Sequence, residues 1–362
     1  MMELELGSLP ICSISQDCAE AGREETGICH DADPRDAEAY LTAMPKAELH
    51  LHLEGTVSPS TLVSLSQRHD EKPLTMLEAN ALYAYKDFKH FLDIWAFVCQ
   101  RIRTSHDYYL IARDMQATLA SQGVKHAEVY VAVGSILTTR AFLRVDEVFA
   151  AIEKARLEAH QAYGISVLWI VDASLFDIAA ELKHKYPAVV GVGIGGNEAA
   201  GPCRWFKDVY AEAKQRGLRL TAHCGEATGS EVGPIEIQDA VEMGVERLGH
   251  AYCAQYDEAL MNELKVRHTA LELNVTSNLC TNVCPEIGQH PIRKYFDRGL
   301  VCTINSDDPA MFGSNLISEY LLVHRNFNFS LADMKVFAEN SFQHSFLGED
   351  DRTRFVTMIR AY

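Results

Sequence analysis

The sequence lacks any long hydrophobic run. None of its apolar stretches approaches the roughly 18 to 20 residues that would cross a bilayer, although the chain has 362 residues. Its first 40 residues also lack the basic start and continuous apolar core of a secretory signal. These absences exclude a membrane-spanning protein and predict a cytoplasmic location.

Basic residues are scarce as well. The chain has 33 Lys and Arg against 50 Asp and Glu, which gives a formal net charge of −17 at pH 7. Binding to nucleic acid needs a basic surface that neutralises phosphates. The composition therefore excludes nucleic acid as the partner.

The cysteines lack the pattern of a disulfide framework. Ten of them are scattered through a large chain without a secretory signal, whereas disulfide frameworks are typical of small secreted domains. Cys280 and Cys284 have three residues between them and no second cysteine pair nearby, which does not suit a structural zinc knuckle. We expect reduced thiols.

Residues 1–40 are acidic, with Arg23 and Arg35 as their only Arg or Lys residues. A segment with so few apolar residues cannot bury enough surface to offset its conformational entropy. We therefore predict a flexible N-terminal tail over residues 1–40 and a single folded domain over residues 41–362. Hydrophobic residues make up 48% of the chain, which is enough for a large core.

After the tail, eight short apolar runs alternate with segments of helical period. Continuous apolar runs are typical of strands that are buried on both faces, as in a parallel sheet wrapped by helices. Eight such units without an evident linker favour an α/β fold of the (β/α)8 TIM-barrel type over an open doubly wound sheet. The runs cover residues 47–53, 126–133, 165–171, 188–194, 218–224, 246–252, 269–275 and 300–306, and the helical segments cover residues 58–121, 145–163, 174–186, 205–216, 235–243, 257–265, 291–298 and 315–324.

The first run ends in "ELHLHLEG", in which His50, His52 and Glu54 share one face of the predicted strand. Alone, this pattern suits a solvent-facing strand as well as half of a metal site. In a TIM barrel, however, functional residues gather at the carboxyl ends of the strands. Later runs carry further polar residues at or just after that end, namely His223, Glu226, His250, Asp307 and Asp308.

These side chains predict a metal site at the carboxyl ends of the strands. Three neutral imidazoles and one carboxylate suit a single zinc ion with room for a water molecule, whose pKa falls to about 7 on zinc. The ligands that we assign are His50, His52, His223 and Asp307. Glu226, His250 and Asp308 are then left for acid–base chemistry and substrate contacts.

From Met44 to Gly348, the chain resembles the adenosine deaminase family, a branch of the amidohydrolase superfamily. The resemblance rests on the motifs "MPKAELHLHLEG", "YKDFKHFLDIW", "GGNE", "HCGEATG", "RLGHAY", "TSN" and "INSDDPAMF", which occur in the order of the family. It implies the same four zinc ligands, one zinc ion per chain, and a small purine nucleoside as the substrate.

The resemblance also implies roles for the remaining residues. Glu226 would protonate N1 of the purine while water attacks C6, and His250 would orient that water and assist its deprotonation. Gly196 would contact N3 and Asp308 would contact N7, and we expect Glu54 and His52 to lie against the substrate. Part of the segment with Phe88, Phe91, Leu92 and Trp95, whose helical spacing is otherwise typical of core packing, would form a lid.

Two departures from the family bear on the substrate. Adenosine deaminases commonly have Asp at the position of Glu54, near the 5′ side of the ribose, and "DLAGDE" where this chain reads "GIGGNE", so that Gly193 replaces an acid. Deamination of adenosine to inosine is our first expectation. Aminodeoxyfutalosine, adenine and other 5′-modified adenosines are the alternatives.

Other classes of protein fit the sequence less well. "GVGIGG", with Gly191, Gly193 and Gly196, matches the dinucleotide fingerprint of an NAD-dependent oxidoreductase, but "NEAAGP" separates it from the next helix. "HAE" imitates the zinc deaminases of nucleic acids without their P-C-x-x-C motif, and we expect His126 to be an edge residue of the second strand. A two-metal amidohydrolase would need a bridging lysine at the end of the fourth run, and that run has none. A non-catalytic nucleoside-binding barrel would have lost a metal ligand or the acid, and none of these residues is missing.

Overall fold

The computed structural model describes residues 34–172 and 176–362. Most of the expected tail lies outside the described residues, and its last part, residues 34–40, belongs to helix α1 (Pro34–Ala43). The division into a flexible tail and a single domain stays a prediction.

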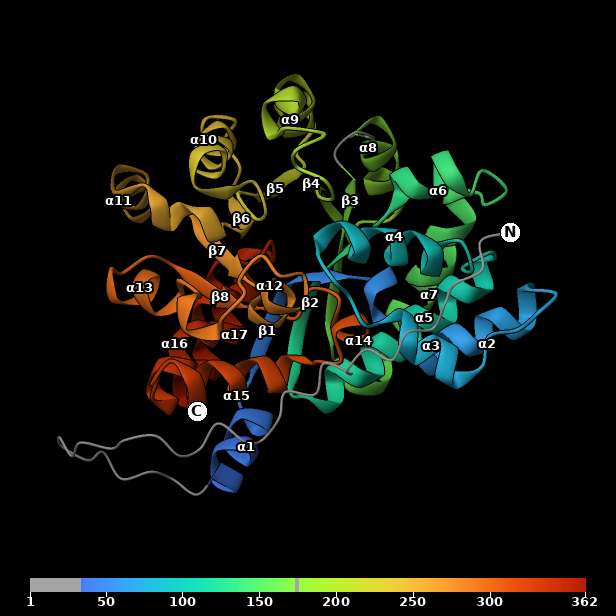
Figure 1. The fold of residues 1–362 in the computed structure, drawn as a ribbon, viewed down its shortest axis with the longest axis horizontal. Helices are drawn as coiled ribbons and strands as arrows, with labels where there is room; N and C mark the ends of the chain where they lie inside the picture. Colours follow the sequence, from blue (N-terminus) through green and yellow to red (C-terminus); the bar gives the residue numbers. More distant parts are fainter. Residues whose placement is uncertain (1–33, 173–175) are drawn as a thin grey trace.

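Eight parallel strands form one sheet in the order in which they occur along the chain, and helices surround it (Figure 1). Each strand pairs with the next in parallel. The strands are β1 (Lys46–His52), β2 (Val124–Val131), β3 (Ser166–Asp172), β4 (Val189–Ile194), β5 (Arg219–Cys224), β6 (Arg247–His250), β7 (Ala270–Leu273) and β8 (Cys302–Ile304). The predicted (β/α)8 TIM-type barrel is confirmed.

The barrel closes between β1 and the residues that follow β8. The His52 amide donates to the Asp307 carbonyl at 2.9 Å, and the Asp307 amide donates to the His50 carbonyl at 3.1 Å. A single bridge between Leu51 and Asp307 is formed instead of a long ladder. This seam places three of the expected site residues next to one another.

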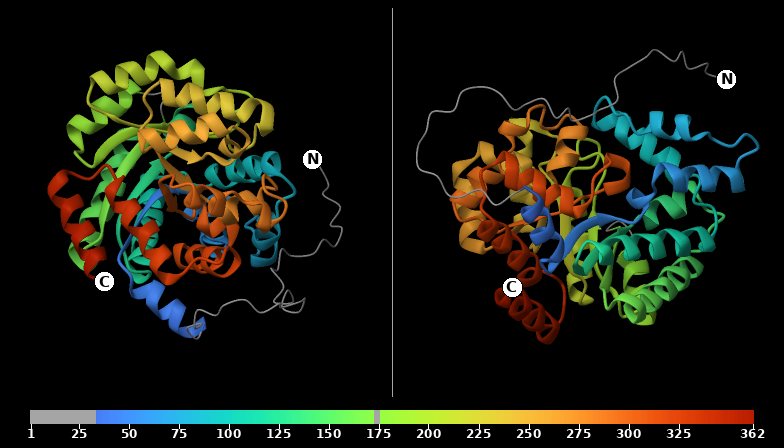
Figure 2. Two further views of the ribbon diagram at one scale, coloured as in Figure 1. Left: turned by 90° about the vertical axis from the view of Figure 1, so that its left-hand side faces the viewer. Right: turned by 90° about the horizontal axis from the view of Figure 1, so that it is seen from below.

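In both views of Figure 2, the helices lie on the outside of the strands. The α-helices that follow α1 are α2 (Pro59–His69), α3 (Met76–Leu82), α4 (Phe88–Cys99), α5 (Ser105–Ser121), α6 (Val133–Thr139), α7 (Val145–Tyr163), α8 (Phe176–Lys185), α9 (Lys207–Gln215), α10 (Gly229–Glu242), α11 (Glu258–Arg267), α12 (Val275–Cys280), α13 (Ile292–Asp297), α14 (Pro309–Phe312), α15 (Leu316–Asn326), α16 (Leu331–Gln343) and α17 (Glu349–Ala361). The 3-10 helices are η1 (Glu54–Thr56), η3 (Cys203–Phe206), η4 (Tyr252–Tyr256) and η5 (Ile287–Gln289).

The two C-terminal helices, α16 and α17, lie beyond the last helix that we predicted. Helix α16 has a clear start signal, because the Ser330 hydroxyl accepts from the Asp333 amide and the Asp333 carboxylate accepts from the Ser330 amide. Helix α10 also begins earlier than expected, at Gly229, and carries Pro234 inside it. The propensity of proline to end helices explains why the predicted helix began at residue 235.

The interior of the barrel contains charged side chains as well as apolar ones. His126 is fully buried, with its Nε2 3.1 Å from Glu128 Oε1 and its Nδ1 3.1 Å from the Ser166 hydroxyl. The expectation of an edge residue was wrong, because β2 lies between β1 and β3 and this side chain points inward to a carboxylate. Arg247 is likewise buried and pairs with Glu128 at 2.7 Å.

The glycines of "GVGIGG" do not open a helix. Strand β4 ends at Ile194, and the next α-helix, α9, begins only at Lys207. A dinucleotide fingerprint places a helix N-terminus directly after its glycines, against the pyrophosphate. The geometry of this segment therefore does not support the oxidoreductase alternative.

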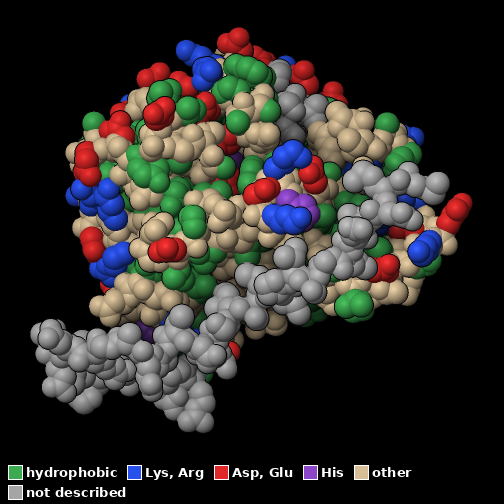
Figure 3. Space-filling view, viewed as in Figure 1, with side chains coloured by type: hydrophobic (Ala, Val, Ile, Leu, Met, Phe, Trp, Pro, Cys, Tyr) green, Lys and Arg blue, Asp and Glu red, His purple; other side chains and the backbone are tan. Residues whose placement is uncertain are grey.

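Among the described residues, no helix is long and apolar enough to cross a membrane. On the face of the molecule shown in Figure 3, acidic and basic side chains are interspersed and hydrophobic side chains lie between them. This face does not carry the single-sign basic surface that nucleic acid binding requires.

Candidate active site

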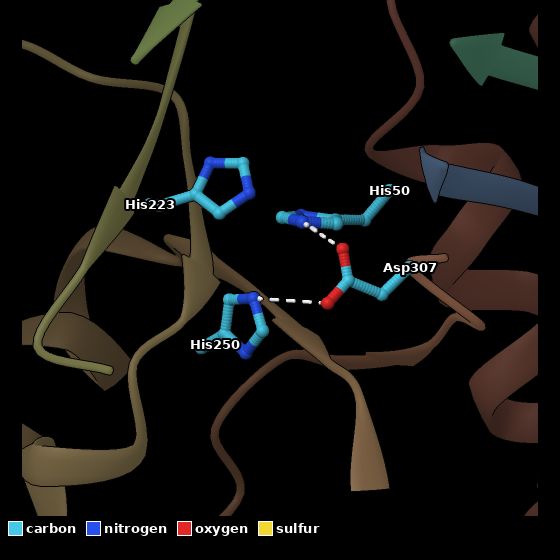
Figure 4. A group of neighbouring side chains, drawn as sticks. All are labelled: His50, His223, His250 and Asp307. Atoms are coloured by element: carbon cyan, nitrogen blue, oxygen red, sulfur yellow. Dashed lines mark ion pairs between the residues drawn. The ribbon is translucent and has the colours of Figure 1, made fainter. Parts of the chain in front are cut away.

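The polar residues expected at the strand ends converge at one end of the barrel. His50 and His52 lie on β1, His223 on β5 and His250 at the end of β6, and Asp307 follows β8. Figure 4 shows the rings of His50, His223 and His250 around the Asp307 carboxylate. Residues far apart in the sequence thus meet because parallel strands in a barrel direct their carboxyl ends to one side.

The donor atoms of the four expected metal ligands lie close together. His52 Nε2 lies 3.0 Å from His223 Nε2 and 3.2 Å from Asp307 Oδ1. His50 Nε2 lies 3.4 Å from Asp307 Oδ1 and, although fully buried, has no hydrogen-bond partner among the described residues. Buried ring nitrogens that face each other and a carboxylate in this way are suited to share a cation.

Two of these histidines are oriented by bonds on the opposite ring nitrogen. His50 Nδ1 lies 2.7 Å from Glu272 Oε2, and His223 Nδ1 lies 2.7 Å from the Ile194 carbonyl oxygen. Both acceptors favour a proton on Nδ1, which leaves the Nε2 lone pair to a metal. This arrangement is the usual support of histidine ligands.

The spacing of the donors suits a tetrahedral ion. Ligands about 2.0 to 2.1 Å from a tetrahedral zinc lie about 3.3 Å from each other, and the distances of 3.0, 3.2 and 3.4 Å between the expected donors bracket that value. Among the described residues, two overlapping groups satisfy the spacing of a metal site, and both contain Asp307. One consists of His50, His223, His250 and Asp307, and the other of His52, Asp307 and Asp308.

His250 is set apart from the other histidines by its partners. Side-chain nitrogens of Asn274 and Asn278 lie 3.2 Å from its Nε2 and 3.1 Å from its Nδ1. Its Nδ1 is also 3.4 Å from Glu226 Oε1, and its Nε2 is 3.6 Å from Asp307 Oδ2. With both ring nitrogens engaged, His250 suits a role beside the metal better than a ligand role.

The backbone is strained at two of the site residues. His250 and Asp307 have φ values of 58° and 63°, in the left-handed region that non-glycine residues seldom adopt. Such strain is commonly found at functional sites, where the surrounding structure holds it in place.

The site residues have strongly perturbed pKa values. Burial alone would lower the pKa of His50, but the neighbouring carboxylates of Asp307 and Glu272 raise it to about 9. Burial lowers the pKa of His250 to about 3 and that of His223 well below its ordinary value, the latter also through the neighbouring histidines. Burial would raise the pKa of Asp307, but the histidines hold it well below its ordinary value.

Glu226 is a buried carboxyl group whose Oε1 lies 3.4 Å from His250 Nδ1. Burial raises its pKa well above the ordinary value, and the nearby Asp307 and Glu198 raise it further. Glu198 fixes the turn, because its Oε2 accepts from the amides of Glu226 at 3.0 Å and Ala227 at 3.1 Å. A carboxyl group that stays protonated near neutral pH can act as a general acid.

Asp308, like Glu226, is a buried carboxyl group with a raised pKa. Burial raises the pKa of its carboxyl well above the ordinary value, with Asp307 as the next cause, and its Oδ1 lacks a hydrogen-bond partner among the described residues. Gly55 provides the room for this carboxyl, since a Cβ on Gly55 would lie 1.9 Å from Asp308 Oδ1. The protonated group is thus available to donate to a ligand.

A cavity of about 240 Å³ lies above these groups. Helix α4 lines it, through the aromatic and aliphatic side chains in which a lid was expected, and Gly196 lines it in a conformation with a φ of 101° that requires glycine. The lining residues are His52, Phe88, Phe91, Leu92, Trp95, Tyr130, Val131, Ala132, Ser135, Gly193, Gly195, Gly196, His223, Glu226, His250, Asp307 and Asp308. An apolar roof over a few polar groups is typical of a small-molecule site.

Glu54 does not line this cavity. It is fully buried, and its Oε1 accepts from the Tyr108 hydroxyl at 2.8 Å and from the Ala132 amide at 3.3 Å. Like His50, it is absent from the residues that line the cavity. The structure therefore gives no support to a direct contact between Glu54 and a substrate.

Several residues of the site were not predicted from the sequence. Glu272 and Asn274 come from β7 and its end, Glu198 follows β4, and Tyr130 of β2 stacks on His52 with ring centroids 4.9 Å apart. Glu272 did leave a signal, because it is a lone acid inside the apolar run "ALEL". Its role depends on the neighbour that the barrel gives it, which the run does not show.

Comparisons with known proteins agree with this geometry. The family model for adenosine deaminase matches residues 45–362. An aminodeoxyfutalosine deaminase from Streptomyces avermitilis is 32% identical over 341 residues, which cover 91% of this chain and 94% of the relative. An adenine deaminase from Ralstonia nicotianae is 32% identical over 341 residues, which cover 90% of this chain and 96% of the relative.

A solved structure supports the same assignment. The crystal structure of an amidohydrolase from Burkholderia ambifaria with bound Zn superposes with a TM-score of 0.81 at 26% sequence identity, and the match covers 93% of this chain and 94% of that chain. Because the family model spans the whole barrel and both relatives exceed 30% identity over most of their length, the chain belongs to the adenosine deaminase family of hydrolytic deaminases.

Proposed function

We propose that the protein is a zinc-dependent deaminase of 6-aminopurine nucleosides, which converts adenosine and water to inosine and ammonia. One observation carries the proposal. The Glu226 carboxyl, whose pKa is raised by burial, faces the same cavity as the expected metal ligands His52, His223 and Asp307 and lies 3.4 Å from His250.

In this proposal His50, His52, His223 and Asp307 hold one zinc ion. Bound there, zinc would supply a water molecule with a pKa of about 7 as the nucleophile. The orientation of His50 by Glu272 and of His223 by the Ile194 carbonyl supports this ligand set. His250 remains outside it, because side-chain nitrogens of two asparagines lie within 3.2 Å of its ring nitrogens.

The other residues act on the purine and the water. Glu226 donates its proton to N1, which makes C6 electrophilic, while His250 orients the attacking water and receives its proton. The C6–O bond then forms, and the amino group takes the proton held by His250, so that the C6–N6 bond breaks and ammonia leaves. The remaining hydroxyl proton returns to Glu226 as C6 becomes the 6-oxo carbon. Asp308 donates to N7, which fits its raised pKa because N7 is an acceptor. The backbone of Gly196 contacts N3.

A second substrate, aminodeoxyfutalosine or another 5′-modified adenosine, is favoured by the position of Glu54. Its carboxylate is bonded to Tyr108 and Ala132 and is not offered to a free 5′-hydroxyl. The name of the relative from Streptomyces avermitilis points to the same substrate. Adenine is a further alternative substrate, because the relative from Ralstonia nicotianae is named an adenine deaminase.

The test is an ultraviolet absorbance assay with measurement of released ammonia. The panel consists of adenine, adenosine, adenosine monophosphate, 5′-methylthioadenosine and aminodeoxyfutalosine, and the zinc content of the purified protein is measured alongside. We expect about one zinc per chain and turnover of at least one nucleoside. A protein that deaminates no member of the panel would refute the proposal.

A further inference from the structure

Glu54, Tyr108 and Arg140 form a buried cluster beside the cavity, which we call the Glu54 cluster. The Tyr108 hydroxyl donates to Glu54 Oε1 at 2.8 Å and accepts from Arg140 Nη1 at 2.8 Å. The residues are fully buried. Arg140 Nη2 and Glu54 Oε1 are 4.0 Å apart, too far for a hydrogen bond. The tyrosine hydroxyl therefore bridges the two charges.

The Glu54 cluster joins segments that are distant in the sequence. Glu54 accepts from the amide of Ala132, at the junction between β2 and α6, through both carboxylate oxygens at 3.3 and 3.4 Å. Arg140 Nη1 also donates to the carbonyl of Cys99, the last residue of α4, at 3.2 Å. Tyr108 itself belongs to α5. One hydroxyl group thus connects helix α4 to the strand ends.

Two of the joined segments supply walls of the cavity. Helix α4 contributes Phe91 and Trp95, and the junction after β2 contributes Ala132 and Ser135. The Glu54 cluster holds a backbone atom at the end of each segment, and its polar partners named above include neither the metal donors nor Glu226. A change in the cluster would therefore alter the width of the cavity without removing a reacting group.

The proposed orientation of the purine shows which substituent would sense that width. Glu226 faces N1, Gly196 faces N3 and Asp308 faces N7, so these three groups occupy three sides of the ring system. N9 lies between N3 and N7 and points away from C6. The remaining walls, built by α4 and by the residues after β2, are then those that meet the group carried on N9.

We propose that the Glu54 cluster is a positioning unit that sets the selectivity for the N9 substituent, an inference that rests on the proposed function. Glu54 acts through Tyr108, Arg140 and the Ala132 amide and does not contact the substrate. The Arg140 atoms Nε and Nη2 have no hydrogen-bond partner among the described residues. The position of the guanidinium thus depends strongly on the Tyr108 hydroxyl.

The sharpest test is Tyr108→Phe, which removes only the bridging hydroxyl. The adjacent Tyr109→Phe is a matched control, because the Tyr109 hydroxyl donates to Glu158 on the exposed side of the same helix at 2.6 Å. Steady-state kcat and KM are measured with adenine, adenosine and 5′-methylthioadenosine, and zinc content is measured for every variant. Glu54→Asp, which keeps the charge and shortens the side chain, serves as a second variant if Tyr108→Phe does not fold.

We expect Tyr108→Phe to change the ratio of kcat/KM between 5′-methylthioadenosine and adenine by about fivefold, which corresponds to the net contribution of one hydrogen bond. Most of the change should lie in KM, with the zinc content unchanged, and Tyr109→Phe should keep the wild-type ratio. Amide hydrogen exchange over α4 should be faster in Tyr108→Phe than in Tyr109→Phe, without any substrate present.

An equal fall on all substrates, an unchanged ratio, or unchanged exchange in α4 would each overturn the inference while leaving the proposed function in place. Absence of deamination by the wild-type protein would overturn the proposed function, and the selectivity role with it. The two failures are therefore distinguishable.

Discussion

Replacement of Glu272 by glutamine should weaken metal binding although Glu272 is not a metal ligand. Its Oε2 lies 2.7 Å from His50 Nδ1, and its Oε1 accepts from Arg247 Nε. The amide oxygen of glutamine can still accept from His50, but without a negative charge. Because hydrogen bonds to charged groups are stronger than neutral ones by about 1 to 2 kcal/mol, we expect zinc affinity to fall about 10- to 100-fold, the range for supporting residues of this kind.

The same change should also destabilise the fold. Arg247 is buried and would lose one of its two carboxylate partners, while Glu128 at 2.7 Å remains. Removal of one partner from a buried ion pair costs about 3 to 5 kcal/mol, and the remaining carboxylate places our expectation at the lower end, about 3 kcal/mol. Urea unfolding of the metal-free protein measures this term separately from zinc affinity.

Zinc affinity is measured by competition with a chromogenic chelator. Glu246→Gln is the matched control, because Glu246 pairs with Arg219 at the surface, with side chains 37% and 36% exposed. An exposed pair contributes about 0 to 1 kcal/mol, so this variant should keep both zinc affinity and stability. If Glu272→Gln binds zinc as tightly as the wild type, the reasoning that Glu272 orients His50 is refuted.

Three further predictions follow from single side chains. Glu226→Gln should retain zinc and lose about 10²- to 10⁴-fold in kcat, the typical contribution of a general acid; substantial turnover by this variant would contradict the assignment. Gly55→Ala should displace the Asp308 carboxyl, because the new Cβ would lie 1.9 Å from its Oδ1, and kcat/KM should fall at least about tenfold without loss of zinc; unchanged kinetics would argue against the N7 contact. Burial raises the pKa of Glu319 from 4.5 to about 7. Between these two pH values the folded state therefore binds more protons than the unfolded state. The free energy of unfolding of the wild type should fall by about 3 kcal/mol as the pH rises from 4.5 to 7. Glu319→Gln keeps an acceptor for the Thr276 amide and should not show this pH-dependent loss of stability. Urea unfolding should therefore show the variant gaining stability relative to the wild type between pH 4 and pH 8. An equal difference between the two proteins at both pH values would contradict the prediction.

The strands and most of the helices could be predicted because their signals are local. Helix α7 was predicted with its observed bounds, 145–163, and each apolar run overlaps the strand that it predicted. The helix boundaries were wrong where a local rule met tertiary packing. Pro234, for example, is accommodated within α10, although proline usually ends a helix.

The convergence of the polar strand-end residues could be predicted from the sequence, but their individual contacts could not. His50, His223, His250 and Asp307 do converge, because a barrel brings strand ends together whatever the connecting loops contain. The expected contact of Glu54 with the substrate found no support, since the side chain leaves the β1 face and bonds to Tyr108 and Ala132. No pattern within the first run contains these two partners.

The sequence by itself determined the order of strands and helices, the polar residues at the strand ends and the family, because periodicity and motif spacing are properties of the chain alone. Tertiary structure decided which ring nitrogen of His50 and of His223 is free, which carboxyl groups have raised pKa values, and that Glu54 does not line the cavity. These properties depend on burial and on partners far away in the sequence, such as Glu272, which lies 222 residues from His50, and only the closed barrel brings such groups together.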